Sequence, residues 1–302
     1  MGGCILVGTA SWTDPTLIKS HKFYPKGCSS AEARLRFYAS RFPLVEVNSS
    51  YYALPSAANS VLWVERTPPG FLFSVKAFRL FTGHQTPLDA LPDVLRADLA
   101  GFASRSGTIY YKDVPAVARD ALWSTFIEAV QPLEAAGKLG TIHFQFAPWL
   151  FYSKAAFEHI EECRARLPAR LLSVEFRHAS WLSEEHRQRT LEFERRLGFV
   201  HVVVDEPQGF QNSVPAVWEV TNPAAAVVRL HGRNSATWKS ASNAASDRFD
   251  YDYPDAELRE LAERVKELAA RTDMALIIFN NNQEDQGQRN AATLMRMLDL
   301  RW

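Results

Sequence analysis

Cysteine is scarce in this 302-residue sequence, and an excess of charge of either sign is absent. The three cysteines, Cys4, Cys28 and Cys163, form no Cys-x-x-Cys pair and have no zinc-ligand spacing. This excludes a disulfide framework and fits a reducing compartment. Lys and Arg together number 34, as do Asp and Glu, giving a formal net charge of zero. That balance argues against attraction of the whole molecule to nucleic acid or an anionic membrane.

Long apolar runs are also missing. No window approaches the roughly 20 apolar residues of a membrane span. The N-terminal segment MGGCILVGTASW has neither the basic start nor the long apolar run of a signal peptide. A cytoplasmic protein with no membrane association is therefore expected. No GxGxxG follows the first apolar run, and no HxH or HExxH occurs. No cofactor is predicted from motifs.

What is present is a regular alternation of short β-branched runs with helical patterns. With 47% hydrophobic residues the chain can bury a large core. The expected strands are 4–8, 44–48, 71–76, 140–146, 171–177, 200–205, 226–231 and 274–280. The expected helices are 30–41, 56–65, 119–136, 153–166, 183–198, 255–270 and 289–298.

Eight strand–helix units predict a closed (βα)₈ barrel, a TIM-barrel-like α/β fold, as one domain over residues 1–302. A doubly wound sheet is the alternative. The segments 77–118 and 232–254 are long. They follow the third and seventh strands, where such barrels carry functional loops.

Polar residues recur at every second strand position, which predicts that they point into the barrel. The positions that alternate with them are apolar and are expected to pack under the helices; they include Val202 and Val204. At least one residue of 280–282 should also face the mouth. The inward set is Glu46, Asn48, Ser74, Lys76, His143, Gln145, Glu175, Arg177, Asp205, Arg229 and His231.

Burying so many ionisable groups costs several kcal/mol per unpaired ion, so stability alone does not explain the cluster. A binding or catalytic site at the C-terminal face of the barrel is the favoured interpretation. The alternative is a buried ion network in which Glu175 pairs with Arg177 or Arg229 and fixes strand register. His143, deeper in its strand, is expected to be a core histidine.

The same residues belong to a set of motifs that resembles the DUF72 (YecE-like) family of uncharacterised TIM-barrel proteins. The matching segments are GTASW (8–12), FYP (23–25), VEVNSSYYALPS (45–56), FSVK (73–76), TGH (82–84), QFAPWL (145–150), VEFRHASW (174–181), RLHGR (229–233), FDYDY (249–253) and FNNN (279–282). The resemblance implies a TIM-barrel fold and a cytoplasmic protein, but no particular reaction. This chain departs from the family pattern at Gly83, which separates Thr82 from His84, and at Asn282.

The first functional hypothesis is an enzyme or ligand-binding protein for a small polar, anionic ligand such as a phosphate or carboxylate. Glu46, Glu175 and His231 are the candidate acid/base residues. Guanidinium groups and an ammonium would bind the anion, amides would orient it and aromatic rings would wall the pocket. The candidate binding residues are Trp12, Asn48, Tyr52, Lys76, Gln145, Arg177, Trp181, Asp205, Arg229, Arg233, Asn280 and Asn281.

Two other functions are open. Glu175, Asp205 and His231 end three consecutive predicted strands and could hold a divalent metal for a hydrolase or isomerase, although the neighbouring cations oppose this. The loop residues Arg233, Trp238, Lys239 and Arg248 interleave bases with an aromatic ring and could contact nucleic acid. The sequence leaves the substrate, the oligomeric state and catalytic turnover open.

Overall fold

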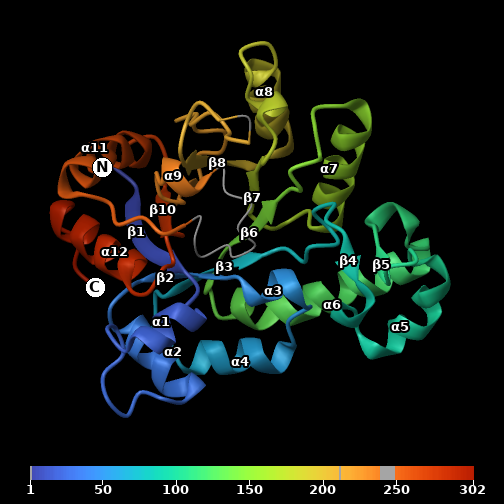
Figure 1. Ribbon diagram of the computed structural model, residues 1–302, viewed down its shortest axis with the longest axis horizontal. Helices are drawn as coiled ribbons and strands as arrows, with labels where there is room; N and C mark the ends of the chain where they lie inside the picture. Colours follow the sequence, from blue (N-terminus) through green and yellow to red (C-terminus); the bar gives the residue numbers. More distant parts are fainter. Residues whose placement is uncertain (1, 211, 239–248) are drawn as a thin grey trace.

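The computed structural model describes residues 2–210, 212–238 and 249–302, without the side chain of Thr237. Eight parallel strands close into a barrel in the order β1-β10-β9-β8-β7-β6-β3-β2. Figure 1 shows these strands around the centre of the molecule with the helices outside them. The strands are β1 (Cys4–Ala10), β2 (Leu44–Val47), β3 (Leu72–Lys76), β6 (Leu139–Gln145), β7 (Leu172–Glu175), β8 (Val200–Asp205), β9 (Ala226–Leu230) and β10 (Met274–Phe279). The predicted barrel is confirmed.

Helices follow the strands at nearly the predicted positions because polar caps fix their starts. Ser30, Ser56 and Ser153 each accept a hydrogen bond from a backbone N–H of the first turn. Gly198 ends a helix in the left-handed conformation, with φ at 67°. The α-helices are α1 (Pro15–Ser20), α2 (Ala31–Ala39), α3 (Ser49–Tyr52), α4 (Ala57–Glu65), α5 (Asp93–Leu99), α6 (Ala116–Ala135), α7 (Lys154–Arg166), α8 (Arg187–Leu197), α9 (Ser235–Trp238), α11 (Asp255–Ala269) and α12 (Gln286–Met297).

The long segment after β3 carries structure of its own. It contains α5 and a small antiparallel pair, β4 (Thr86–Pro87) with β5 (Thr108–Ile109). Figure 1 shows this insertion at the side of the molecule away from the two termini. Because β4 follows β3 by only nine residues, the start of the insertion stays at the C-terminal end of the barrel.

The barrel interior is layered from apolar to polar. Leu44, Val227 and Leu276 belong to an inner apolar cluster separate from the core under the helices. Above it, Ser74 and Thr141 share a hydrogen bond of 2.9 Å between their hydroxyl oxygens. Charged residues occupy the C-terminal end. Among the described residues this apolar layer fills the lower barrel, which leaves the C-terminal face as the place for a site.

One strand has the opposite phase to the prediction. Val202 and Val204 belong to the inner apolar cluster, whereas Val203 belongs to the core under the helices. The prediction that Val202 and Val204 pack under the helices was therefore wrong. The alternation also turns Asp205 outward.

No helix in the described ranges is both long and apolar enough to span a membrane.

Candidate functional site

A cavity of about 550 Å³ opens at the C-terminal end of the barrel. Residues from β3, β6, β9 and the segments that follow several strands contribute to its wall. Its size lies within the range of small-molecule sites, about 300–1,000 Å³. The wall consists of Asn48, Tyr51, Tyr52, Lys76, His84, Gln145, Pro148, Arg177, His178, Ala179, Asn212, Arg229, His231, Trp238, Phe249, Asn280 and Asn282.

The charge in this wall has one sign. Lys76, Arg177 and Arg229 line the cavity, whereas no Asp or Glu does among the residues that the structure describes. The balancing carboxylates of Glu46 and Glu175 are fully buried below the wall. A ligand in the cavity therefore meets cations and imidazoles, and its access to the carboxylates is blocked.

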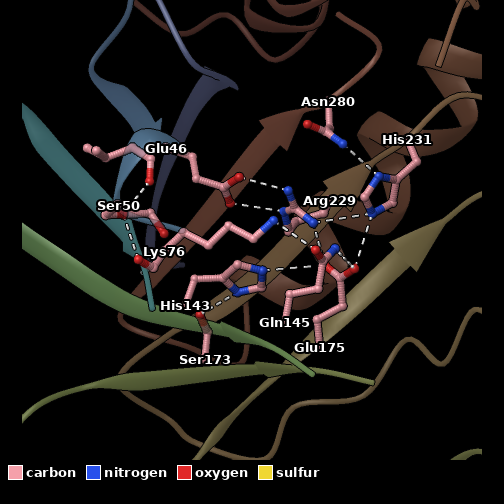
Figure 2. A network of polar contacts seen from close by, with 12 residues as sticks. Glu46, Ser50, Lys76, His143, Gln145, Ser173, Glu175, Arg229, His231 and Asn280 are labelled. Atoms are coloured by element: carbon pink, nitrogen blue, oxygen red, sulfur yellow. Dashed lines mark hydrogen bonds and ion pairs between the residues drawn. The ribbon is translucent and has the colours of Figure 1, made fainter. Parts of the chain in front are cut away.

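Arg229 joins the two buried carboxylates. Its Nε and Nη2 donate to Oε2 and Oε1 of Glu46 at 2.9 and 2.7 Å, which is a bidentate pair. Its Nη1 donates to Oε2 of Glu175 at 2.6 Å. Figure 2 shows the guanidinium between the two carboxylates. The contacts join β2, β7 and β9 across the barrel, so the predicted ion network exists.

Glu175 is also the acceptor for groups that reach the cavity. Nε2 of Gln145 donates to its Oε1 at 2.6 Å. Nη1 of Arg177 lies 3.3 Å from the same oxygen, and Nε2 of His231 lies 3.4 Å from it. On the other side of the ring, Nδ2 of Asn280 lies 2.8 Å from Nδ1 of His231 (Figure 2). With the amide donating, Nδ1 accepts and Nε2 carries the proton directed at Glu175.

The buried carboxylates stay ionised. Burial alone would raise the pKa of Glu175, but the charge of Arg229 outweighs it and holds this pKa well below the usual value of 4.5. The pKa of Glu46 is lowered by Arg229 against the same opposing effect of burial. Neither group carries a proton to donate at neutral pH.

The pKa values of the basic groups in the cavity wall are lowered, which favours their neutral forms. Burial lowers the pKa of Lys76 to about 8, and the charge of Arg229 acts in the same direction. Burial likewise lowers the pKa of His231 to about 4 and that of His84 to about 3. Both imidazoles are therefore neutral at pH 7, and Lys76 titrates near the physiological range.

Most predicted site residues meet at this cavity. Glu46 and Glu175 lie directly beneath it, held by Arg229. His143 is fully buried at a deeper level, with Nδ1 at 3.1 Å from the hydroxyl of Ser173, as expected for a core histidine. The predicted residues in the wall are Asn48, Tyr52, Lys76, Gln145, Arg177, Arg229, His231 and Asn280.

Asp205 and Arg233 do not join them. Nε and Nη2 of Arg233 donate to Asp205 at 2.9 and 2.6 Å, and the hydroxyl of Tyr253 donates to it at 2.9 Å. Both Asp205 and Arg233 line a separate surface hollow that also includes Trp218. The prediction that Asp205 faces inward was wrong because the alternation of β8 has the opposite phase. Arg233 consequently does not converge with Lys76 and Arg177.

Three further candidates lie outside the wall. Trp12 is buried in the core, with its ring 5.8 Å from that of Trp63. Trp181 is fully buried and donates from Nε1 to the carbonyl of Leu150 at 2.7 Å. The amide of Asn281 donates to the carbonyl of Tyr251. Their loops turn these side chains into the core, which sequence position after a strand does not reveal.

Glu206 is a charged residue near the site that sequence reasoning missed. It has the same phase as Val202 and Val204, and its Oε2 lies 2.8 Å from Nη2 of Arg177. It replaces Asp205 as the third carboxylate near the site. No signal in the sequence identified it, because the valine run of β8 leaves the phase of this strand undetermined. The other cavity-lining residues outside the predicted binding set are Tyr51, His84, Pro148, His178, Ala179, Asn212, Trp238, Phe249 and Asn282, of which Asn282 belongs to the run 280–282 expected to reach the mouth.

The residues considered for a metal site and for nucleic-acid binding do not come together in one place. Glu175 and His231 lie together, but Asp205 faces away from them. In the part of the chain that the structure describes, no three His, Cys, Asp or Glu side chains are grouped as metal ligands. Of the loop residues considered for nucleic acid, Lys239 and Arg248 lie outside the described residues, and Trp238 is buried.

Comparison with known proteins matches the whole architecture. The UPF0759 protein YunF of Bacillus subtilis is 29% identical over 301 residues, covering 99% of this chain and 96% of that protein. A DUF72 family crystal structure from Enterococcus faecalis superposes with a TM-score of 0.81 at 26% identity, covering 99% of this chain and 96% of the other. One from Thermotoga maritima gives 0.76 at 29% identity, covering 98% and 99%.

The family profile described as "Protein of unknown function DUF72" matches residues 6–302. This match includes all eight barrel strands except the first two residues of β1. The chain therefore belongs to the DUF72 family.

Proposed function

We propose that the cavity binds a small polar ligand carrying a phosphate or carboxylate, and that the protein is an enzyme acting on it. The observation that carries this proposal is the wall itself: three cations and no carboxylate among its described residues. A guanidinium aimed into a cavity matches the oxygens of such an anion. The reaction class most compatible with these groups is a hydrolysis or isomerisation with proton transfer.

Arg177 is the principal anion-binding candidate. Arg229 is saturated by Glu46 and Glu175, which leaves it few donors for a ligand. Arg177 has only a single contact with each of its carboxylate neighbours, at 3.3 Å to Glu175 and 2.8 Å to Glu206. Its planar group can thus still donate to a ligand oxygen.

Neutral amides and aromatic rings would select the rest of the ligand. Oδ1 of Asn48 is buried and has no hydrogen-bond partner among the described residues. A ligand hydroxyl donating to it would satisfy this acceptor, because unpaired buried acceptors are costly. Tyr52 is 62% exposed at the cavity wall, and its ring offers an apolar surface. The ligand class is therefore a hydroxylated anion.

Acid/base chemistry is reassigned within the predicted set. Glu46 and Glu175 are ionised and paired below the wall, so we propose that they orient Arg229, Gln145 and His231 instead of contacting ligand. His231 lines the cavity and is neutral, with one ring nitrogen near Glu175. It is the proposed proton acceptor: Nδ1 would take the proton on giving up the hydrogen bond from Asn280, and Glu175 at Nε2 stabilises the imidazolium that forms.

The test is ligand-induced stabilisation. Inorganic phosphate and a panel of phosphorylated and carboxylated metabolites are screened by thermal shift, and hits are measured by calorimetry. Arg177→Gln should weaken binding by about tenfold or more because it removes a charge-assisted contact. The matched control is Arg170→Gln, since Arg170 has the same 15% side-chain exposure and an ion pair with Glu134, but precedes β7.

Equal loss of affinity in both variants would refute the assignment of Arg177. A requirement for stoichiometric divalent metal, removed by chelator and restored by supplementation, would favour the metal-dependent alternative instead. Salt-sensitive retention on single-stranded DNA would favour nucleic-acid binding.

A further inference from the structure

Lys76 lies in a cavity wall with two other cations, but the groups that contact its amine are uncharged. It is the last residue of β3, it lines the cavity and its side chain is largely buried. Its Nζ donates to Oε1 of Gln145 at 2.8 Å and lies 4.7 Å from the centroid of the Tyr51 ring. Within the described ranges, no carboxylate forms an ion pair with it. The amine therefore lacks a contacting carboxylate, and the more distant charges of Glu46 and Glu175 favour its charged form less than burial and Arg229 oppose it.

The orientation of Gln145 is fixed from below. Its Nε2 donates to Glu175, and Glu175 in turn accepts from Arg229. With its nitrogen committed to Glu175, the amide presents its oxygen to Lys76 (Figure 2). An amide oxygen accepts from an ammonium and, more weakly, from a neutral amine, so this contact positions Nζ in both protonation states.

Burial and the charge of Arg229 lower the pKa of Lys76 to about 8. On the order of a tenth of the side chain is then neutral at pH 7, against well below a hundredth for an ordinary lysine. A neutral amine beside a second cation is the arrangement that activates lysine as a nucleophile.

We propose that Lys76 forms a Schiff base with aldehydes or ketones that carry a phosphate or carboxylate. The inference rests on the proposed function, because Arg177 in the same cavity wall would hold the anionic group. It narrows the proposed anionic ligand to one that also carries an aldehyde or ketone group. It also gives the chain a covalent catalytic residue.

The chemistry balances without a cofactor. The lone pair of Nζ attacks the carbonyl carbon, and the C=O electron pair moves onto oxygen. That oxygen gains a proton while the nitrogen loses one, giving a carbinolamine. A second proton, taken up from solvent, lets the hydroxyl leave as water while the nitrogen lone pair forms C=N; the resulting iminium returns one proton to solvent when it becomes the neutral imine. The net reaction joins one amine and one carbonyl and releases one water, with no change of oxidation state.

Reductive trapping tests this step. The full chain is incubated with pyruvate or dihydroxyacetone phosphate and sodium cyanoborohydride, which reduces the imine to a stable amine. We expect one adduct per chain by intact mass, located on Lys76 by peptide mapping. Lys76→Arg should abolish it while keeping the far-ultraviolet circular dichroism spectrum.

Lys138 provides an internal control. It lies just before β6 and is also buried, but its Nζ donates to the backbone carbonyls of Val64 and Thr67. It should remain unmodified in the same digest. An adduct spread over surface lysines without excess at Lys76, or an unchanged yield in Lys76→Arg, would overturn the inference.

Two further probes separate this inference from the proposed function. Inorganic phosphate has an anion but no carbonyl, and glycolaldehyde has a carbonyl but no anion. Stabilisation by phosphate with no adduct at Lys76 from either carbonyl acid would refute the Schiff base and leave anion binding standing. Trapping of glycolaldehyde as efficient as that of pyruvate, with no effect of phosphate, would overturn the anionic substrate class.

Discussion

Arg229 and Glu46 form a bidentate pair between strands that are 183 positions apart in sequence, with Nε–Oε2 and Nη2–Oε1 distances of 2.9 and 2.7 Å. Both side chains are essentially without solvent exposure. A buried pair of this kind adds little net stability, because the desolvation of both ions offsets their attraction. Removing one partner is a different matter, since it leaves a buried charge uncompensated.

Arg229→Met is therefore expected to lower the free energy of unfolding by about 3–5 kcal/mol. Glu46 and Glu175 would both lose their shared cation. Urea denaturation at pH 7 measures the change. Arg170→Met removes a pair with a partly exposed glutamate and should cost about 0–1 kcal/mol. Adding Glu46→Gln and Glu175→Gln to Arg229→Met should recover part of the loss. If Arg229→Met loses no more unfolding free energy than the control, the contacts of Arg229 with Glu46 and Glu175 do not stabilise the barrel.

Stability should fall on acidification, beginning well above the carboxylate range. The pKa of His231 is about 4 in the folded protein and near 6.5 when unfolded. Between these values the unfolded chain binds the extra proton, so unfolding becomes easier as pH falls. One such group contributes about 1.4 kcal/mol per pH unit. Glu46 and Glu175, with lowered pKa values, add their own loss only as pH falls below about 4.5.

Replacing His231 by Gln isolates its share, because other buried histidines titrate in both proteins. Urea unfolding from pH 7 to pH 4.5 should show the wild type losing stability faster than His231→Gln as pH falls, by about 1.4 kcal/mol per pH unit. Parallel curves would mean that His231 is not held neutral.

The opposite orientations of Asp205 and Glu206 give a paired prediction. Asp205→Asn weakens the contacts with Arg233 and Tyr253 and should cost about 1–3 kcal/mol of stability, with anion affinity unchanged. Glu206→Gln removes a carboxylate that competes for Arg177, and should raise phosphate affinity several-fold. Calorimetric titration measures the phosphate affinity of both variants, and urea unfolding measures the stability of Asp205→Asn. Loss of affinity in Asp205→Asn would place Asp205 in the site after all.

These neighbours also show where prediction from sequence stops. On most strands polar and apolar residues alternate, as in VEV at 45–47 or VVRLH at 227–231, and the inward face can be identified. In β8 the run Val202–Val204 has no such contrast, so its phase was inferred from Asp205 alone and was wrong. The error also misplaced Arg233, whose position depends on its partner.

Loop direction was the second limit. Trp12, Tyr52 and Trp181 all follow strand ends in the sequence, yet only Tyr52 lines the cavity. Trp181 packs instead on Phe176, with ring centroids 4.2 Å apart. Pattern reasoning locates a side chain at the correct end of the barrel. Whether it turns inward depends on contacts made by segments distant in sequence.

Lys76 provides the last prediction, because function and stability should oppose each other there. Its lowered pKa means that the ammonium form of Lys76 destabilises the folded protein at neutral pH. Stability therefore rises as pH increases from about 8 toward 10.5. Lys76→Met removes this cost and fills similar space with an apolar chain. We expect a gain of about 1 kcal/mol at pH 7, with the alkaline rise in stability lost.

Urea unfolding at pH 7 and pH 9.5 measures both effects. Lys138→Met is the control for removing a buried lysine. Its Nζ satisfies backbone carbonyls, so this variant should be destabilised by about 1–3 kcal/mol, because acceptors are left unpaired. If Lys76→Met loses stability as Lys138→Met does, Lys76 is a structural ion. A gain in stability together with lost ligand-induced stabilisation would identify Lys76 as a residue retained for function at the expense of stability.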